Sequence, residues 1–390
     1  MLPSKRRILI LTDWFIPGYK AGGPIRSVLN IIEALKNHFN FSVITSNTDF
    51  GSSEPYENIE PDEWRRMDGF RAYYISHSQL TYRTIKRLLK SSDYDIIYLN
   101  SLFSSYFTLI PLWVAKAAGL QTRIVLAPRG MLGKGALAIK SRKKMLFLKL
   151  AKGLGFYDRV IWHASTVHEE LEIRKIFGSN TSVFVAPNLV SLTNSIEDTI
   201  KPKKTVDTAY FVFISRISPK KNIHKALHFF QQLDTDKQSK IVFDIYGPIE
   251  DESYWAECKS MITDLVKNGI QVTYKGVLPY KDIGNTLSKY HFFVMPTSHE
   301  NFGHAIVEAM ASGCPVIISD QTPWHNLQSY NCGWDIPLSD EDQFLCAIHQ
   351  SIKMDGDTYK EWSDGARQFV REKIQTTEIV EQNKQLFEQA

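Results

Sequence analysis

Residues 295–310 read MPTSHENFGHAIVEAM, and this stretch decides the fold of the carboxyl-terminal half. It begins at the end of an apolar run, 292–295, which is short and continuous, as are strands buried on both faces of a parallel sheet. A polar turn follows, and a helical pattern begins near Phe302 and Gly303. The start of a helix offers unpaired backbone N–H groups and a partial positive charge, which attract phosphate or sugar oxygens. The stretch therefore predicts a strand, a ligand-binding turn and a helix.

Two acidic residues flank this turn. Glu300 stands just before the predicted helix and Glu308 about one and a half turns into it, so both side chains can reach one pocket. Alternatively, Glu300 is a charge favoured by the helix dipole and Glu308 is a solvated helix residue. The residues alone favour neither interpretation.

A second cluster, FVFISRISPKKN at 211–222, also places a polar loop between a strand and a helix. The loop carries three cations, Arg216, Lys220 and Lys221. Arginine holds phosphate oxygens through two parallel hydrogen bonds, and lysine adds a compact charge. Such bonds stabilise by about 1.5–3 kcal/mol each, so the loop is suited to a diphosphate without a metal. A solvated basic loop is the alternative.

Short β-branched runs alternate with helical segments along almost the whole chain. The runs lie at 8–12, 41–45, 96–99, 123–127, 160–163, 183–186, 210–215, 241–246, 270–274, 292–295 and 315–319. A chain of 390 residues is also too long for one core. The pattern predicts an α/β fold of two doubly wound, Rossmann-like domains, whose ligands bind beyond the carboxyl ends of the strands.

The boundaries of these domains follow from a change in composition. Residues 188–207 are polar and lack apolar periodicity, which is typical of a linker. We expect a first domain at 1–190, a linker at 191–207 and a second domain at 208–375. Residues 376–390 read as a terminal helix that packs back on the first domain.

Composition excludes several classes of protein. The apolar fraction of 43% and charged fraction of 23% are those of a soluble globular chain. A net charge of +4 argues against a nucleic-acid partner, and the four cysteines form no CxxC pair for zinc. Asp13 ends the first apolar run too early for a signal peptide, and no run reaches the roughly 18 residues of a membrane span. We therefore expect a cytoplasmic protein.

Together, the two clusters resemble the family-4 retaining glycosyltransferases of GT-B fold, the group 1 glycosyl transferases. That family carries an Arg-x4-Lys loop and two glutamates separated by seven residues, with Phe-Gly between them. Arg216, Lys221, Glu300 and Glu308 match in order and spacing. The resemblance implies transfer of a sugar from a UDP- or GDP-sugar to a glycan or lipid-linked glycan, with retention, in cell-surface polysaccharide synthesis. It implies an acceptor-side first domain, a donor-binding second domain and no obligatory cofactor or metal.

The resemblance also implies roles for single residues. Arg216 and Lys221 would bind the diphosphate, Glu308 the ribose hydroxyls, and Glu300 the transferred sugar as a catalytic residue. The other donor contacts would be Asn301, Phe302 and Gly303 at the turn, and Gly276 and Val277 beside the nucleobase. This sequence departs from the family at Asn222, often glycine there, and at the less glycine-rich turn 246–248.

The first half supplies further parts by the same resemblance. Gly22 and Gly23 match a turn over the donor phosphates, although a simple turn is the alternative. His163, at the end of a strand, resembles the family histidine near the reaction centre, where it would be catalytic, although such histidines are structural at least as often. Arg129 follows another strand and would meet the acceptor.

Residues 134–154 form a basic segment in which leucines alternate with cations and no acid occurs. A basic amphipathic helix of this kind can lie on anionic lipid, which suggests a peripheral contact at the cytoplasmic membrane face. A domain helix with a basic polar face is the alternative.

Three other functions compete with transfer. A nicotinamide-dependent oxidoreductase requires Gly-x-Gly-x-x-Gly directly after a strand, and neither 22–23 nor Gly247 provides it. A sugar-nucleotide epimerase of the same fold stays open, and so does a non-catalytic sugar-nucleotide-binding protein. The presence of both the Arg216/Lys221 and Glu300/Glu308 pairs argues against the last of these.

Overall fold

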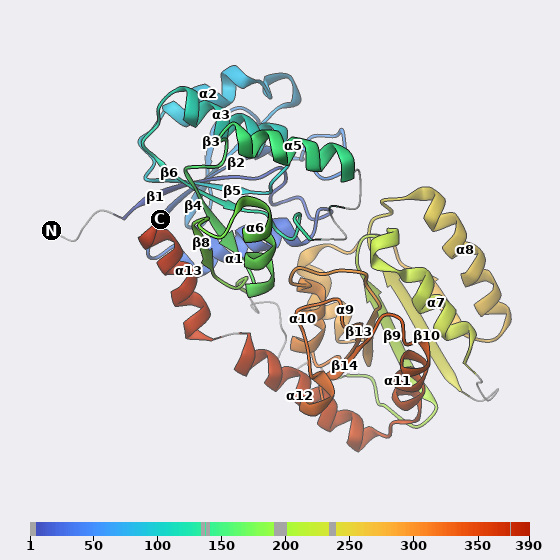
Figure 1. Ribbon diagram of the computed structural model, residues 1–390. Coiled ribbons are helices and arrows are strands. Elements are labelled where there is room, and N and C mark those ends of the chain that lie inside the picture. Colours follow the sequence, from blue (N-terminus) through green and yellow to red (C-terminus); the bar gives the residue numbers. More distant parts are fainter. Residues whose placement is uncertain (1–4, 134–136, 138–140, 191–200, 234–238, 375) are drawn as a thin grey trace. The chain divides into compact units, whose positions relative to one another are not determined.

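The computed structural model describes residues 5–133, 137, 141–190, 201–233, 239–374 and 376–390. The chain forms two compact units, each with its own sheet (Figure 1). Unit 1 consists of Met1–Ser191 and Thr377–Ala390, and unit 2 of Leu192–Thr376.

Unit 1 is built on an eight-stranded sheet in the order β3-β4-β2-β1-β5-β6-β7-β8. Every neighbouring pair is parallel except β3 with β4. Without the two edge strands β3 and β8, the order is β4-β2-β1-β5-β6-β7. This is the 3-2-1-4-5-6 arrangement of a doubly wound fold. The strands are β1 (Arg7–Leu11), β2 (Asn40–Ser46), β3 (Trp64–Arg66), β4 (Phe70–Ile75), β5 (Ile96–Asn100), β6 (Arg123–Ala127), β7 (Val160–Ala164) and β8 (Val183–Val185).

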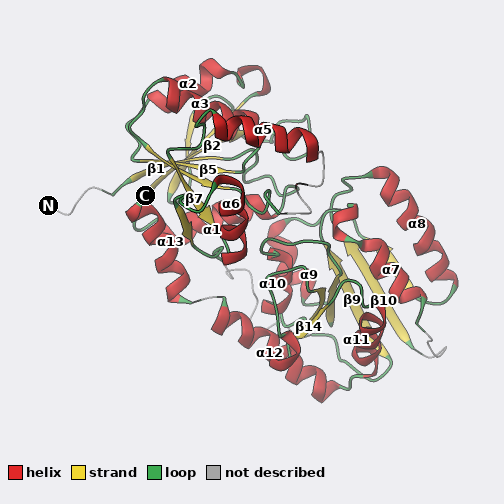
Figure 2. Ribbon diagram, viewed as in Figure 1, coloured by secondary structure: helices red, strands yellow, loops and turns green. Residues whose placement is uncertain are grey.

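Strand β1 shows why these runs are continuously apolar. Leu9 and Leu11 belong to one buried cluster, and Ile8 and Ile10 to another on the opposite face, so helices cover both faces (Figure 2). The helices of unit 1 are α1 (Gly23–Leu35), α2 (Tyr82–Lys90), α3 (Ile110–Ala117), α5 (Ser141–Gly153), α6 (Val167–Phe177) and α13 (Thr377–Gln389). The fully buried Phe387 of α13 packs in this unit, which confirms the predicted return of the terminal helix.

Unit 2 has a six-stranded parallel sheet in the order β11-β10-β9-β12-β13-β14, again the doubly wound arrangement. Its strands are β9 (Thr208–Ile214), β10 (Lys240–Tyr246), β11 (Gln271–Tyr274), β12 (Phe292–Met295), β13 (Val316–Ser319) and β14 (Gly333–Ile336). Its helices are α7 (Ile223–Gln231), α8 (Glu252–Lys267), α9 (Ile283–Leu287), α10 (His304–Ala311), α11 (Glu341–Lys353) and α12 (Gly356–Lys373). All five runs predicted for this half are strands, and β14 is an addition.

The order of the strands positions the site. In unit 2, chain connections leave β9 and β12 toward opposite edges of the sheet, and such a switch point opens a crevice at the carboxyl ends of the two strands. The loops that follow these strands are 215–222 and 296–303, the two clusters that the sequence singles out. In unit 1 the same position lies between β1 and β5.

Candidate functional site

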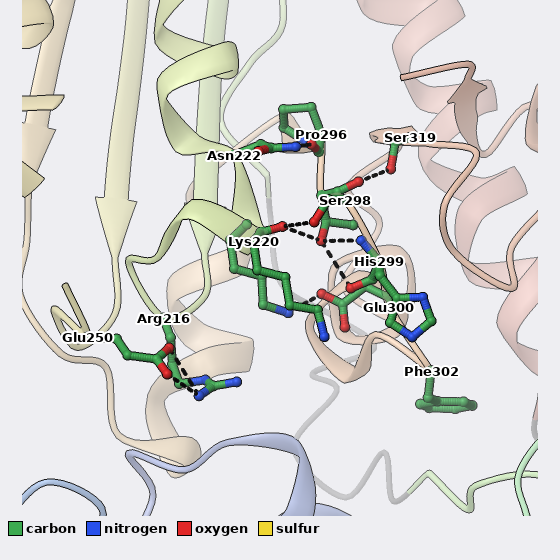
Figure 3. A network of polar contacts seen from close by, with 12 residues as sticks. Arg216, Lys220, Asn222, Glu250, Pro296, Ser298, His299, Glu300, Phe302 and Ser319 are labelled. Atoms are coloured by element: carbon green, nitrogen blue, oxygen red, sulfur yellow. Dashed lines mark hydrogen bonds and ion pairs between the residues drawn. The ribbon is translucent and has the colours of Figure 1, made fainter. Parts of the chain in front are cut away.

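The loops after β9 and β12 are fastened to each other by hydrogen bonds (Figure 3). Ser298 donates to the Lys220 carbonyl from both its backbone N–H and its hydroxyl, at 2.9 Å each. The buried Asn222 donates from Nδ2 to the Pro296 carbonyl at 2.9 Å. Asn222 is left-handed, with φ 53°, a conformation that asparagine tolerates better than most residues. The asparagine thus keeps the backbone conformation that glycine would give and adds a bond between the loops.

Helix α10 begins where the sequence predicts. Gly303 is the residue before its first turn and has φ 79°; a Cβ there would meet Ile306 Cδ1 at 2.8 Å. Phe302 is buried beside Trp324, whose Nε1 donates to the Phe302 carbonyl at 2.6 Å. These contacts fix the backbone conformation of Phe302 and Gly303, directly before the first turn of α10.

Lys221 and Glu300 form an ion pair across the two loops, with only 11% and 12% of their side chains exposed. Burial by itself would raise the pKa of Glu300, but Lys221 and then Lys220 outweigh it and hold this pKa below its usual value. Glu300 is therefore a carboxylate at neutral pH. Removing either partner would leave an uncompensated buried charge, which typically costs about 3–5 kcal/mol.

Arg216 lies in a second and more open ion pair. Its NH1 is 3.1 Å from both carboxylate oxygens of Glu250, and the two side chains are 34% and 35% exposed. Figure 3 shows this pair beside Lys220. Burial, and then the neighbouring Lys221, lower the pKa of Lys220 to about 8. Three cations and two carboxylates thus share the switch point of unit 2.

The other residues predicted to bind the sugar-nucleotide donor also lie in unit 2, on a helix and a loop that follow strands of its sheet. Glu308 is a partly exposed residue in the second turn of α10. Gly276, with φ 80°, accepts a hydrogen bond from Gly247 N at 2.9 Å, so the ends of β11 and β10 are joined there, with Val277 next in the chain. The structure therefore brings Lys221 and Glu300 into direct contact and places Arg216 near enough to influence the pKa of Lys220. Residues 301–303 continue the chain from Glu300.

The residues predicted in the first half lie in unit 1. Gly22, with φ 69°, precedes α1, and Gly23 is its first residue. His163 is buried, and both its ring nitrogens are engaged: Nε2 with the Ala186 carbonyl and Nδ1 with the Tyr98 hydroxyl, each at 2.8 Å. A carbonyl only accepts, so Nε2 carries the proton and Nδ1 accepts from Tyr98. Burial, and then Arg129, lower the pKa of His163 to about 3, which keeps the ring neutral.

Arg129 ends this chain of hydrogen bonds at the carboxyl edge of the sheet. It donates to Tyr98 OH at 2.7 Å, to Asn100 Oδ1 at 2.8 Å and to Asn188 Oδ1. Its φ of 54° is unusual for a long side chain, and such strained residues cluster at functional sites. Every one of these three acceptors is neutral.

The sequence interpretation missed two participants, Glu250 and Asp13, and the burial of Lys220. Glu250 and the burial of Lys220 depend on tertiary contacts that no motif shows. Asp13, the second residue after β1, accepts from Ser104 Oγ at 2.7 Å, and burial raises its pKa. Its place at the switch point of unit 1 is a signal that the strand pattern contains. In the part of the chain that the structure describes, no group of three or more His, Cys, Asp or Glu is placed to hold a metal ion.

Comparison with known proteins assigns the fold and the second unit. Solved structures of GT-B fold cover nearly the whole chain: sucrose-phosphate synthase from Thermosynechococcus elongatus (TM-score 0.73, 17% identity, 99% of both chains) and Anabaena Alr3699/HepE in complex with UDP and glucose (TM-score 0.68, 15% identity, 98% of this chain and 99% of that one). Residues 195–369 match the model of the glycosyl transferases group 1. The matched residues lie in unit 2, which is thus similar to that family, on a chain of GT-B fold.

Two curated relatives point the same way. The chain is similar to O-antigen chain mannosyltransferase B of Escherichia coli, with 25% identity over 226 residues, 51% of this chain and 57% of the relative. It is also similar to O-antigen chain mannosyltransferase RfbU of Salmonella typhimurium, with 28% identity over 158 residues, 40% of this chain and 42% of the relative. The chain thus matches about half the length of each.

The bond from Asn222 to Pro296 can be tested by substitution. Asn222→Gly keeps the left-handed backbone but leaves a buried carbonyl without its donor, so we expect a loss of about 1–3 kcal/mol in the free energy of unfolding of unit 2. Asn326→Gly is the matched control, because Asn326 is also left-handed but exposed. Its effect should stay within about 0.5 kcal/mol in urea unfolding. Equal stability of the two variants would contradict a fastening role for Asn222.

Proposed function

We propose that this protein is a retaining glycosyltransferase that moves a sugar from a UDP- or GDP-sugar to a glycan or lipid-linked glycan, in the synthesis of a cell-surface polysaccharide. One observation carries the proposal: Arg216, Lys221 and Glu300 converge at the switch point of a sheet that belongs to a group 1 glycosyl transferase domain. An anionic donor is the ligand that this arrangement of charge suits best.

The residues of unit 2 would divide the donor between them. Arg216, Lys220 and Lys221 hold the diphosphate, and the backbone at 301–303 adds N–H groups at the start of α10. Glu308 would bind the ribose, and Gly276 and Val277 would lie beside the base. Cations arranged in advance stabilise the charge that builds on the leaving phosphate, so the site requires no metal for this step.

Glu300 would be the catalytic residue that contacts the transferred sugar. It is held as a carboxylate by Lys221, which suits binding of sugar hydroxyls. Retention would follow from attack on the same face that the phosphate leaves, with the leaving phosphate taking the acceptor proton. His163 would act through Tyr98 and Arg129, since both of its nitrogens are engaged. Arg129 would meet the acceptor, and Gly22 and Gly23 would form the turn over the donor phosphates.

The printed names of the similar proteins guide the choice of donor. HepE was solved with UDP and with UDP-glucose, and a trehalose-6-phosphate synthase of E. coli with UDP-2-fluoro glucose. The two curated relatives are mannosyltransferases. Glucose and mannose nucleotides are therefore the first donors to test.

Nucleotide binding is the direct test of the donor site. We expect either UDP or GDP, with its sugars, to raise the melting temperature, since ligand at about 100 times Kd stabilises by about 2.7 kcal/mol. Arg216→Gln should weaken binding by about tenfold, because it removes one charged hydrogen-bonding group. Lys267→Gln, an exposed change on α8, should bind as the wild type does. No shift with any of these nucleotides would contradict the proposed function.

Product analysis separates transfer from the remaining enzyme class. A nucleoside diphosphate released together with a glycosylated acceptor identifies a transferase. A free epimerised sugar nucleotide would instead identify an epimerase of the same fold.

The pKa of Lys220 predicts how nucleotide affinity depends on pH. Lys220 has a pKa of about 8, so it is mostly charged at pH 7 and mostly neutral at pH 9. A diphosphate binds the charged form better, so affinity should fall as pH rises through 8, by at most about tenfold per pH unit. Lys220→Arg keeps its charge throughout and should show a flat profile in titration calorimetry. The same pH dependence in both proteins would contradict this role.

We further propose that unit 1 contacts an anionic membrane surface through α5 and α3. Leu146, Leu150 and Leu154 are 59%, 58% and 73% exposed and recur every four residues, so they share one face. Trp113 of α3 is also exposed, and Lys116, on the same helix, donates to the Leu154 carbonyl at 2.7 Å. The exposed cations nearby on α5 are Lys143, Lys149 and Lys152. Residues 134–136 and 138–140 of the predicted basic segment lie outside the described residues.

No helix among the described residues has the length and apolar character to cross a membrane. The proposed contact would be peripheral, at the cytoplasmic membrane face. Sedimentation with phosphatidylserine-containing vesicles at low salt should capture the protein, and high salt should release it. Leu150→Ser with Leu154→Ser should abolish capture. Val167→Ser with Leu171→Ser, which changes two exposed apolar residues of α6, should not. Equal capture of both double variants would contradict this surface.

A further inference from the structure

The loops after β9 and β10 continue to pair beyond the ends of their strands. Ser215 N donates to the Tyr246 carbonyl at 3.1 Å, Ile217 N to the Pro248 carbonyl at 2.8 Å, and Glu250 N to the Ile217 carbonyl at 3.0 Å. This short ladder places Arg216 directly opposite the loop that carries Glu250. The backbone hydrogen bonds therefore hold the two side chains close enough to form their ion pair.

Gly247 makes the ladder possible. It has φ 140°, and a Cβ at this position would lie 1.8 Å from the Ser215 carbonyl oxygen. Any other residue would push the two loops apart. The sequence 246–248, which departs from the glycine-rich turn of the family, thus keeps the one glycine that holds Glu250 against Arg216.

The two ion pairs of the site differ in how easily they exchange. Lys221 and Glu300 are almost buried, so separating them would leave two buried charges without a compensating partner. Arg216 and Glu250 are about one-third exposed, and pairs of that kind typically contribute little to stability. Arg216 can therefore change its anionic partner at small cost, whereas Lys221 keeps Glu300.

We propose that Glu250 is a built-in competitor of the donor diphosphate. Its carboxylate occupies the Arg216 guanidinium in the ligand-free protein, and the diphosphate displaces it on binding. When the nucleoside diphosphate product leaves, Glu250 takes its place again, which lowers product affinity and speeds release. The inference rests on the proposed function, since it requires that a nucleoside diphosphate binds at Arg216.

The charge balance of the site supports this assignment. Burial and then Lys221 lower the pKa of Lys220 to about 8, whereas the carboxylates of Glu300 and Glu250 both act to raise it, so Lys220 feels the charges of both pairs. Two carboxylates therefore offset most of the charge on three cations before any ligand enters. A carboxylate at the exposed end of such a cluster weakens the attraction for a diphosphate, and its removal strengthens it.

The test measures UDP and GDP binding by titration calorimetry, with dissociation rates from stopped flow. Glu250→Gln should bind the nucleotide that the wild type prefers about three- to fivefold more tightly and release it more slowly. Glu252→Gln removes an exposed acid two residues further along and should change affinity by less than about 1.5-fold. Arg216→Gln combined with Glu250→Gln should bind as Arg216→Gln alone, because the competition requires the guanidinium.

Three results would overturn the inference. Unchanged binding by Glu250→Gln would show that Glu250 has no effect on nucleotide affinity. Weaker binding would show that Glu250 favours the bound nucleotide. An equal gain in affinity in Glu252→Gln would show that the loss of any nearby negative charge has the same effect, without competition at Arg216. A gain that persists without Arg216 would place the competition elsewhere. Wild-type protein that binds neither nucleotide would contradict the proposed function itself, whereas the other results leave that function standing.

Discussion

The ion pair between Lys221 and Glu300 is the constraint on which the candidate site depends. The two residues are 79 positions apart in the chain and lie on loops that follow neighbouring strands of one sheet. An almost buried pair of charges is tolerated only if each charge has the other in place. The bonds from Asn222 and Ser298 keep the two loops in register, so the pair, the loops and the start of α10 form one unit.

The sequence predicted the strands whose runs are short and continuously apolar. It missed β3, β4 and β14. The strand β4 carries Arg71 in an otherwise apolar run, and β14 carries Asp335, whose carboxylate accepts from two backbone N–H groups of a neighbouring turn. In β4 and β14 a polar side chain interrupts the pattern but has its own partner in the fold, and that partner cannot be read from the local sequence.

The candidate site was predictable where chemistry follows strand ends, as at Arg216, Lys221 and Glu300. It was not predictable where function depends on the partner of a side chain. Glu250 meets Arg216 only because Gly247 allows two loops to pair, and His163 has both nitrogens engaged only because Tyr98 and Ala186 lie beside it. Residue types suggest which groups are present, whereas burial and hydrogen-bond partners decide which remain available to a ligand.

The two units hold their arginines in opposite ways. In unit 2, Arg216 is paired with a carboxylate, so an incoming anion has to replace an existing anion. In unit 1, Arg129 is oriented by three neutral acceptors, and the neutral His163 fixes Tyr98 as one of them. Orientation by neutral groups keeps the charge of a guanidinium uncancelled, whereas pairing with a carboxylate cancels it until exchange occurs. Hydrogen bonds to neutral groups, as at Arg129, suit an arginine that has to stay charged throughout the reaction. Pairing with a carboxylate, as at Arg216, suits an arginine whose ligand has to leave in every cycle.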